Sequence, residues 1–202
     1  MAELAGDVIR ARPSMFPLVA FDRIDDADAD AALVAWGHWL GACSRPFGRQ
    51  SFGLHLHSQL VAVAVSASTV NARCGGYDRG EVVELARLVS RPDCAWATRV
   101  CLRLWRELAP AAWGKAYWPV RACVSYANAI RHTGDVYRFD GWRRVADVAG
   151  GNPGVDTAWK RPRKAAKEPK SVWAWDVAAR APAQAGGTTR EQSSDTTKGG
   201  TP

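Results

Sequence analysis

Residues 124–145, VSYANAIRHTGDVYRFDGWRRV, decide the fold. They continue an apolar, β-favouring run that begins at Ala122 and breaks at Asn128. A short polar segment leads to Tyr137, and Gly141 then precedes a second strand-like run. A glycine at such a junction ends a helix in a left-handed conformation that a side chain would resist. The stretch therefore predicts a strand, a short helix and another strand in succession.

The sequence on either side of this stretch supplies the other elements. The acidic run Asp25–Asp30 is typical of a helix start, because its side chains cap free amides and favour the positive end of the helix dipole. His57–Ser58 lies between two apolar runs and suggests a tight turn, and Pro110 should end the long amphipathic helix. We predict strands at 16–21, 52–56, 59–67, 82–89, 120–126, 142–148 and 171–177, and helices at 31–40, at 94–108 and just before Gly141.

Composition favours one globular domain in a reducing compartment. The 202 residues suit a domain of about 150 residues with a tail, and a hydrophobic share of 47% with ten tryptophans provides a core. No apolar run of about 18 residues occurs, so no membrane span is expected, and the N-terminus shows no secretion signal. The five scattered cysteines never form a CxxC pair, which indicates reduced, buried thiols in a cytoplasm and no zinc site.

The net charge of +7 is partly concentrated in one segment and points to a polyanionic partner. Residues 159–170, WKRPRKAAKEPK, hold six basic residues against one acid, Glu168. This segment is either a solvated, flexible loop or a contact for a phosphate backbone, and charge alone does not separate the two. Along the chain we expect an irregular N-terminus at 1–15, a domain at 16–178 with a basic loop at 150–170, and a disordered tail at 179–202.

Polar residues in the later strands and loops are candidates for chemistry, each with an ordinary structural alternative. His132 has an unperturbed pKa of about 6.5, which suits proton transfer near neutral pH, or it makes a loop hydrogen bond. Tyr137 either donates a proton to a leaving group or packs its ring beneath the sheet. Asn128 can donate and accept hydrogen bonds but cannot act as a base. Ser125 and Tyr126 are neighbours in a strand, so they face opposite sides.

The central strand 82–89 carries two charged residues, for which an ion pair is the ordinary interpretation. Simple alternation puts Glu84, Ala86 and Leu88 on one face of this strand, and Leu85 and Arg87 on the other.

The spacing of Tyr137, Gly141 and Trp142 resembles the end of Gcn5-related N-acetyltransferase domains. So does the predicted order of strand, helix, three strands, helix, strand, helix and two strands. The resemblance implies an α+β fold, with a mixed, largely antiparallel sheet and flanking helices, in which two central strands part to hold an acyl donor such as acetyl-CoA. It places that donor against the backbone of Val89, Arg91, Ala97 and Thr98. Such proteins usually have glycines around the donor pyrophosphate, whereas residues 91–99 contain none and Trp96 would crowd it.

A more specific resemblance, over residues 30–148, is to the phage Mom family. It is carried by HWLG at 38–41, by ELARL at 84–88, and by SYAN, HTG, Tyr137 and Gly-Trp between 125 and 142. Members of that family place a carbamoylmethyl group on adenine N6 of DNA, which blocks restriction endonucleases that read the major groove. The resemblance implies double-stranded DNA as partner, catalytic roles for Tyr137, His132, His38, Arg87 and Ser125, and substrate contacts from Trp39, Phe47, Tyr126 and Asn128. The family commonly has aspartate in place of Asn128 and tyrosine in place of Trp39, so a possible base or metal ligand is missing here.

In this interpretation the adenine leaves the duplex stack at a cost of roughly a few kcal/mol, which phosphate contacts offset. Trp39 or Phe47 would stack on the base, Tyr137 or His132 would handle the proton, and Arg87 would position the donor. Two alternatives stay open. One is an acetyl-CoA-dependent N-acetyltransferase acting on a small-molecule or protein amine, and the other is a nucleic-acid-binding module without catalysis. The sequence does not predict the donor, the DNA sequence context or the oligomeric state.

Overall fold

The computed structural model describes residues 18–45, 47–149 and 168–177 of the chain. The N-terminal segment 1–15, most of the basic loop 150–170 and the tail 179–202, for which the sequence made predictions, therefore lie outside the described residues. Within the described part, no helix is both long and apolar enough to cross a lipid bilayer.

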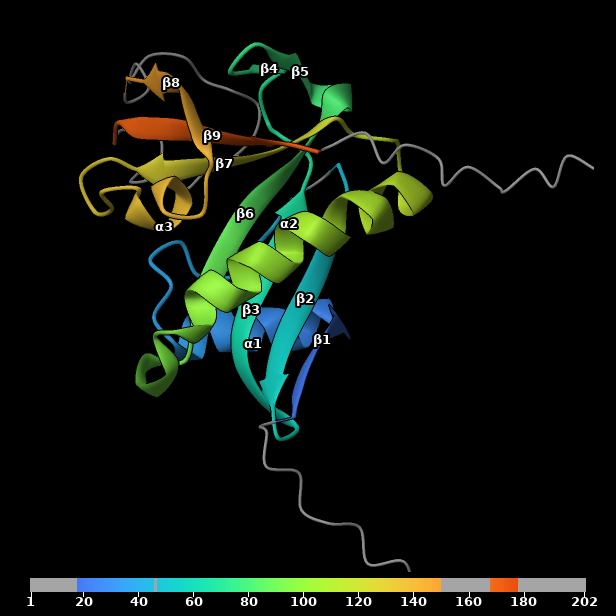
Figure 1. The fold of residues 1–202 in the computed structure, drawn as a ribbon, viewed down its shortest axis with the longest axis vertical. Helices are drawn as coiled ribbons and strands as arrows, with labels where there is room; N and C mark the ends of the chain where they lie inside the picture. The colour runs from blue at the N-terminus through green and yellow to red at the C-terminus, as the bar shows by residue number, and fades with distance from the viewer. Residues whose placement is uncertain (1–17, 46, 150–167, 178–202) are drawn as a thin grey trace, which may run out of the picture.

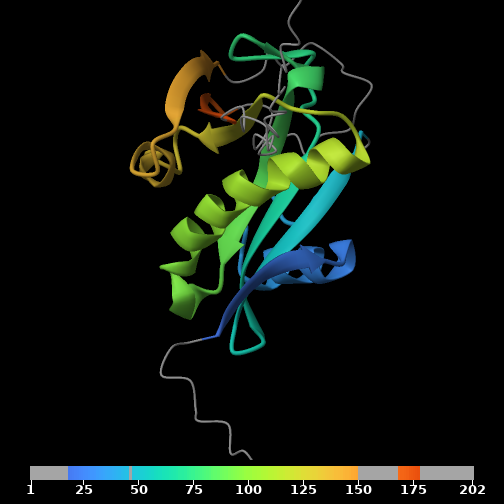
Figure 2. The same cartoon turned by 45° about the vertical axis from the view of Figure 1, so that its right-hand side comes forward.

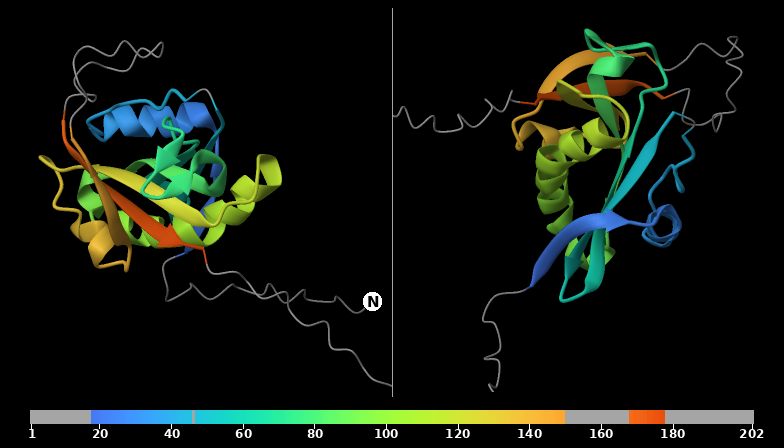
Figure 3. Two further views of the ribbon diagram at one scale, coloured as in Figure 1. Left: turned by 90° about the horizontal axis from the view of Figure 1, so that it is seen from above. Right: turned by 90° about the vertical axis from the view of Figure 1, so that its right-hand side faces the viewer.

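A seven-stranded sheet forms the centre of the molecule, with helix α1 (Asp26–Ala35) on one face and helix α2 (Ala97–Ala116) on the other (Figures 1 and 3). In spatial order its strands are β1 (Val19–Ile24), β2 (Arg49–Leu56), β3 (Gln59–Ala67), β6 (Val82–Ser90), β7 (Ala122–Asn128), β9 (Lys170–Asp176) and β8 (Arg143–Val148). The short strands β4 (Arg73–Cys74) and β5 (Tyr77–Asp78) form a separate hairpin, and the short helix α3 (Asp135–Arg138) precedes β8. The predicted order of the main elements and the mixed, largely antiparallel α+β fold are confirmed.

Strands β6 and β7 are the parallel pair of the described sheet, and they part after four residue pairs. Residues 82–85 of β6 pair with residues 122–125 of β7. Beyond this ladder, β6 continues beside β3 while β7 continues beside β9. Figures 1 and 2 show the two strands diverging in a V, with α2 and α3 on one side of it. Beyond the ladder, the inner edges of both strands therefore have no strand partner among the described residues.

A β-bulge in β6 changes which of its residues share a face. Consecutive residues of β3 pair with Leu85 and with Arg87, so Ala86 is an extra residue without a partner. Leu85 and Leu88 pack on the α2 side, whereas Ala86 packs on the α1 side and Arg87 reaches the loop after α1. The predicted alternation was therefore wrong in separating Arg87 from Glu84, because the bulge shifts the pleat by one residue.

Helix α1 begins and ends earlier than the predicted 31–40. Aspartates of the acidic run form its first turn, where their charge favours the helix dipole, so the run lies inside the helix. Gly37 has a φ of 71° and ends the helix in the left-handed conformation. The N–H of His38 then donates to the Leu33 carbonyl at 2.9 Å, which completes a glycine-based helix end. This turn places His38 directly after the helix.

Helix α2 continues through Pro110, where the sequence predicted its end. A proline inside a helix removes one backbone hydrogen bond and costs about 3 kcal/mol. The chain nevertheless stays helical beyond it because Trp113 is fully buried in the main core and packs against Tyr117 and Trp118. Burial of this large ring offsets the cost of the proline.

The other predicted elements agree with the structure apart from shifts at their ends. The largest are at both ends of β1, predicted at 16–21, and at the start of β2, predicted at 52–56. Both residues of the tight turn His57–Ser58 have positive φ, as a two-residue hairpin turn requires. Gly141 has a φ of 84° and follows α3, which confirms its predicted role. All five cysteines are free and buried, as expected of reduced thiols.

Candidate active site

Two hydroxyl groups meet at the point where β6 and β7 part. The Ser125 hydroxyl donates to the Leu85 carbonyl at 3.1 Å, and these residues form the last pair of the parallel ladder. The Tyr137 hydroxyl oxygen lies 2.9 Å from the Ser125 oxygen. The structure thus joins a serine and a tyrosine that the sequence singled out, in one hydrogen-bonded chain at the apex of the V.

Aromatic packing holds Tyr137 in place. Its ring stacks on Trp173, with 5.8 Å between ring centroids, and meets the edge of Trp142 at 5.4 Å. Gly134 precedes α3 with a φ of 81°, and a Cβ there would lie 2.3 Å from Cζ2 of Trp173. Burial raises the pKa of Tyr137, although the hydrogen bond to Ser125 acts in the opposite direction. The phenol is therefore protonated at neutral pH.

Backbone amides of β6 beyond the parallel ladder face the side that β7 has left. Arg91 donates its N–H to the Val61 carbonyl of β3 at 2.9 Å. Because hydrogen bonds alternate along an antiparallel strand, the amides of Leu88 and Ser90 point away from β3, into the V. The predicted contacts of the acyl donor with the backbone of Arg91 and Val89 need correction. The Arg91 N–H is bonded to β3, and by the same alternation the Val89 N–H also points to β3.

The first turn of α2 adjoins the end of β6. The Thr98 hydroxyl donates to the Ser90 hydroxyl oxygen at 2.7 Å and ties the helix to the strand. Amides at the start of a helix, such as that of Ala97, have no intrahelical acceptor. The Thr98 N–H reaches the Ala95 carbonyl only at 3.4 Å. Trp96, the residue before the helix, is 48% exposed, so its ring lies at the surface next to these amides.

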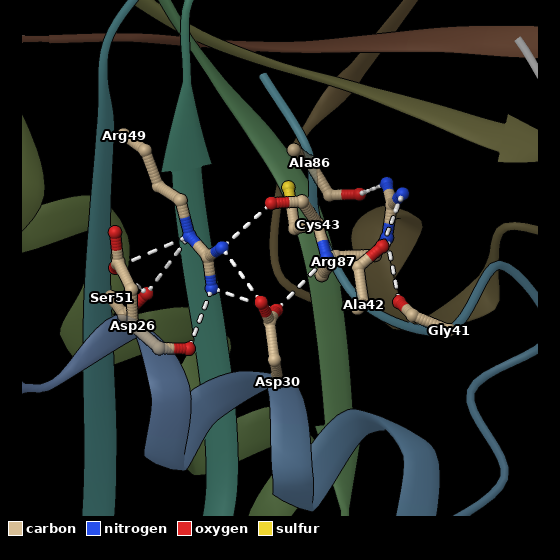
Figure 4. Close-up of polar contacts among 9 residues, drawn as sticks. All are labelled: Asp26, Asp30, Gly41, Ala42, Cys43, Arg49, Ser51, Ala86 and Arg87. Atoms are coloured by element: carbon tan, nitrogen blue, oxygen red, sulfur yellow. Dashed lines mark hydrogen bonds and ion pairs between the residues drawn. The ribbon is translucent and has the colours of Figure 1, made fainter. Parts of the chain in front are cut away.

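Arg87 lies on the α1 face of the sheet, beside the loop that follows α1. Its guanidinium donates to the carbonyls of Gly41, Ala42 and Ala86 at 3.2, 3.5 and 2.7 Å (Figure 4). No carboxylate in the described part of the chain forms an ion pair with it. Burial lowers the pKa of Arg87, yet a guanidinium keeps its charge at any ordinary pH. The α1 face therefore holds a partly desolvated positive charge.

An ion pair fixes the loop that supplies these carbonyls. Arg49 contacts Asp30 at 2.8 Å and donates to the Cys43 carbonyl at 2.6 Å, while Asp30 accepts the Cys43 N–H at 2.9 Å. Partial burial by itself would raise the pKa of Asp30, but the hydrogen bond from Arg49 holds it below the usual value. Figure 4 shows how this pair connects α1, β2 and the loop.

His38, at the start of the same loop, is a neutral hydrogen-bond donor. Its Nδ1 accepts the N–H of Leu40 at 3.3 Å, which leaves the proton of the neutral ring on Nε2. Burial, together with repulsion from Arg87 and His132, lowers the pKa of His38 to about 4. A ring in this state is a poor base at neutral pH. The same electrostatic coupling places the exposed His132 and Arg87 near His38, so three predicted site residues gather on the α1 face.

A buried ion pair lies beside them. The carboxylate of Glu84 contacts the Arg45 guanidinium at 2.5 Å, and both side chains are largely buried. Burial raises the pKa of Glu84, although neighbouring cations, Arg45 first, favour its charged form. The Tyr126 hydroxyl bonds the Cys74 thiol close to this pair, and burial raises the pKa of Tyr126 as well.

The aromatic residues predicted to stack on a base are in different places. The Trp39 ring lies under the Arg131 guanidinium, 5.2 Å from ring centroid to Cζ, so it reaches from the loop after α1 to the end of β7. Phe47 lies under the Arg79 guanidinium at 5.2 Å, next to the paired end of β6 and β7. The structure places Trp39 on the α1 face with His38 and Arg87, whereas Phe47 lies away from the V.

Asn128 has its polar atoms occupied within the protein. Its Oδ1 accepts the N–H groups of Ile130 and Arg131 at 2.9 and 3.2 Å, and its amide nitrogen contacts Glu168. The side chain is buried. Asn128 therefore caps the turn after β7. The sequence predicted a contact with substrate for this residue and not this structural role.

The structure divides the predicted residues into two groups on opposite faces of the sheet. Ser125 and Tyr137 lie on the α2 face; on the α1 face are His38, Trp39, Arg87, Tyr126 and His132. Sequence reasoning missed Arg45, for which the signal was only a basic residue in a turn-rich loop. Among the described residues, no group of three or more His, Cys, Asp or Glu side chains is arranged to hold a metal ion.

Comparison with known proteins bears on the fold. No family model matches the sequence, and neither does any curated protein. Among solved structures, the ribosomal-protein-S18-alanine N-acetyltransferase of Escherichia coli matches with a TM-score of 0.51 at 13% identity, over 79% of this chain and 94% of that one. NAA60 of Arabidopsis thaliana, in complex with acetyl-CoA, matches with a TM-score of 0.51 at 9% identity, over 79% and 99% of the two chains. The fold is that of the Gcn5-related N-acetyltransferases.

The spermidine/spermine N-acetyltransferase SpeG of Vibrio cholerae also matches, with a TM-score of 0.50 at 6% identity, over 79% of this chain and 95% of that one. At such low identities the likeness concerns the architecture, including the strands that part, and not the individual side chains of the site.

Proposed function

We propose that the chain is an N-acyltransferase that moves an acyl group from a coenzyme A thioester to an amine. The observation that carries this proposal is the Tyr137–Ser125 hydroxyl pair at the point where β6 and β7 part. The pair lies on the same face as the first turn of α2, beside amides of β6 that no described strand pairs with. Acyl transfer from a thioester needs groups that bind the donor and an acid that protonates the departing sulfur. The amides and the protonated phenol can take these two roles.

The residues on the α2 face fit the thioester half of such a donor. The amides of Leu88 and Ser90 can bond an extended amide chain as a neighbouring strand would. The free amides at the start of α2 suit a phosphate, although glycines are lacking there and Trp96 takes up space. When bound, acetyl-CoA would supply an acyl group with a good leaving group. NAA60, which shares the fold, was solved with acetyl-CoA.

Side chains of the protein can perform both proton transfers, one to the departing sulfur and one from the attacking amine. The Tyr137 phenol is protonated and stands at the apex, where a departing sulfur would need a proton. An amine that attacks from the α1 face must lose a proton, and His132 is the exposed imidazole on that face. His38 is poorly suited to this task because its pKa lies near 4. The buried Glu84 is held by Arg45.

Modification of adenine N6 in duplex DNA is a second candidate, with the DNA as acceptor on the α1 face. It is supported by the Arg87 guanidinium on this face, which forms no ion pair with a described carboxylate, and by the Trp39 ring, which reaches across the V. Arg45 and Arg131 on the same face are paired with Glu84 and Glu168. Guanidinium groups suit phosphates, and an indole suits stacking on an extruded base. The resemblance of residues 38–41 and 125–142 to the phage Mom family agrees with this candidate.

One experiment tests both candidates. The purified full-length chain is incubated with acetyl-CoA and a mixture of amines or duplex DNA, thiol release is followed, and products are analysed by mass spectrometry. Plasmid from expressing cells is hydrolysed to nucleosides in parallel. We expect amine-dependent thiol release and an acetylated amine; a heavier deoxyadenosine would select the second candidate. Absence of thiol release and of any modified nucleoside, with the protein folded, would refute both.

A further inference from the structure

We propose that the acceptor carries an anionic group, a carboxylate or a phosphate, and that Arg87 binds this group on the α1 face of the V. The inference rests on the proposed function, because it names the class of amine that the same site would take. It concerns the acceptor and not the donor, since Arg87 and the Tyr137 hydroxyl lie on opposite faces of the sheet.

The first support is the unfinished hydrogen bonding of Arg87. A guanidinium has five N–H donors, and three of them reach the carbonyls of Gly41, Ala42 and Ala86. One N–H on each terminal nitrogen is left over among the described residues. Two donors on two nitrogens match two oxygens of a carboxylate or a phosphate. Figure 4 shows the guanidinium on the side of β6 that faces away from β3, next to Gly41 and Ala42 of the loop after α1.

The second support is the missing counterion. The neighbouring guanidiniums contact carboxylates, Glu84 for Arg45 and Asp30 for Arg49, whereas no described carboxylate lies within ion-pair distance of Arg87. The charge of Glu84 acts on Arg87 only from further away, and Arg45 takes its direct contact. Removing a charge from water without pairing it is costly, so a partly buried, unpaired guanidinium is best explained by a partner that arrives with the ligand.

The third support is the charge around this position. Glu84 is already bound to Arg45, so it offers no free carboxylate to an ammonium group. His38 presents its Nε2–H and carries no negative charge, and His132 is near enough for its charge to act on His38. These surroundings repel polycations. The chain should therefore not share the acceptor class named for SpeG, a spermidine/spermine N-acetyltransferase.

Histidine NMR signals test anion binding without any turnover. The chain has four histidines, and two of them, His55 and His57, lie at the β2–β3 hairpin and serve as internal references. Labelled protein is titrated with sodium acetate, with inorganic phosphate and with ethanolamine at constant ionic strength. We expect saturable shifts of the His38 and His132 imidazole signals with at least one anion, none with ethanolamine, and unchanged reference signals.

Three variants separate a ligand-binding role of Arg87 from a structural one. In Arg87→Gln the saturable shifts should vanish. In Arg87→Lys, which keeps the charge but loses the two-pronged geometry, the dissociation constant should rise by about tenfold or more. Arg73→Gln, which removes the same charge from an exposed position, should bind like the wild type. Reference signals that stay in place show that each variant is folded. Equal shifts in Arg87→Gln, or none in the wild type, would overturn the proposal.

A matched set of acceptors then distinguishes the sources of the anion. β-Alanine, O-phosphoethanolamine and ethanolamine share an aminoethyl group, and a duplex oligonucleotide offers a phosphodiester. We expect an anionic acceptor to exceed ethanolamine in kcat/KM by about tenfold or more, and Arg87→Gln to erase that ratio. If anions shift the histidine signals but no acceptor reacts, the proposed function fails and the anion site stands. If ethanolamine reacts best and the signals stay still, only the anion site fails.

Discussion

Among the described residues, the Tyr137 hydroxyl bonds Ser125, and its ring packs against Trp142 and Trp173. Because burial keeps the phenol protonated, removal of this hydroxyl should affect proton delivery more than stability. We expect Tyr137→Phe to lower kcat by about 10²–10⁴-fold, the range of general acid catalysis, and to change the free energy of unfolding by about 1 kcal/mol. Steady-state kinetics with acetyl-CoA and urea unfolding measure the two effects.

Tyr117→Phe is the matched control for this substitution. The Tyr117 hydroxyl bonds the backbone of Arg49 at 3.1 and 3.2 Å, away from the V. Its loss should leave kcat within about twofold of the wild type, since surface hydrogen bonds contribute little to chemistry. Equal kcat values for Tyr137→Phe and Tyr117→Phe would remove the phenol from the proposed reaction.

The low pKa of His38 has a consequence for stability at acidic pH. In the folded protein the imidazole stays neutral down to about pH 4, whereas in the unfolded chain it takes up a proton near the ordinary histidine pKa of 6.5. Protons therefore favour the unfolded chain as the pH falls from 6.5 to 4. Compared with His38→Gln, the wild type should lose about 2–3 kcal/mol of stability over this interval and none above it.

Urea unfolding of the wild type and His38→Gln at several pH values measures this difference. His57→Gln, at the exposed hairpin turn, provides a control that should follow the wild-type curve. Parallel curves for the wild type and His38→Gln between pH 4 and 6.5 would contradict a neutral, buried His38.

At the scale of the elements, glycines position the short helix that carries Tyr137. Gly134 and Gly76 both have positive φ, but only at Gly134 would a Cβ meet another group, the Trp173 ring at 2.3 Å. Gly76→Ala should cost about 1–2 kcal/mol for the backbone conformation alone. Gly134→Ala adds a clash worth roughly 1–3 kcal/mol more and displaces the ring on which Tyr137 stacks.

Thermal unfolding and kcat, measured side by side for the two alanine variants, check this comparison. The loss of stability should be greater in Gly134→Ala, and only that variant should also lose activity. Equal stability losses would show that Trp173 moves aside at little cost.

How far the sequence predicts these elements depends on whether local or distant contacts decide them. Gly141 and the turn at His57–Ser58 were predicted because backbone conformation is a local property of residue type. The continuation of α2 beyond Pro110 depends on the burial of Trp113 in the main core, to which strands far away in the chain also contribute. Element order alone sufficed for the fold class.

For the candidate site, the sequence pointed to individual residues but not to their arrangement. Ser125, Tyr137 and His132 stand in a motif, so their positions along the chain are informative. The face on which Arg87 lies depends on the bulge at Ala86, which no local pattern announces. The pairing of Arg45 with Glu84 joins residues 39 apart in the sequence, and such a contact becomes visible only in three dimensions.

At the scale of the whole molecule, a buried ion pair connects the parts on either side of the V. Asp140, between α3 and β8, is fully buried and contacts Arg103 and Arg106 of α2. The Arg106 guanidinium also lies 3.7 Å from the centroid of the Trp175 ring in β9. Asp140→Asn removes the negative charge and should cost about 3–5 kcal/mol, because the buried Arg106 then keeps only the exposed Glu107 as a carboxylate partner.

Urea unfolding measures this cost, and hydrogen exchange shows whether β7, β9 and β8 lose protection before β1, β2 and β3. Asp147→Asn is the control, because its partner Arg144 is exposed and surface pairs contribute about 0–1 kcal/mol. A loss as small as that of the control would mean that the two parts are held together by other contacts.

The four-pair ladder between β6 and β7 leaves few backbone bonds to determine how wide the two strands stand apart. In the described part of the chain, side chains also connect the two sides of the V, among them Asp140 with Arg106 and the rings around Tyr137. For an acyltransferase, the length of acyl chain that is accepted would then be a matter of a few substitutions. Selectivity for longer or branched acyl groups would then change while the pairing of the strands stays the same.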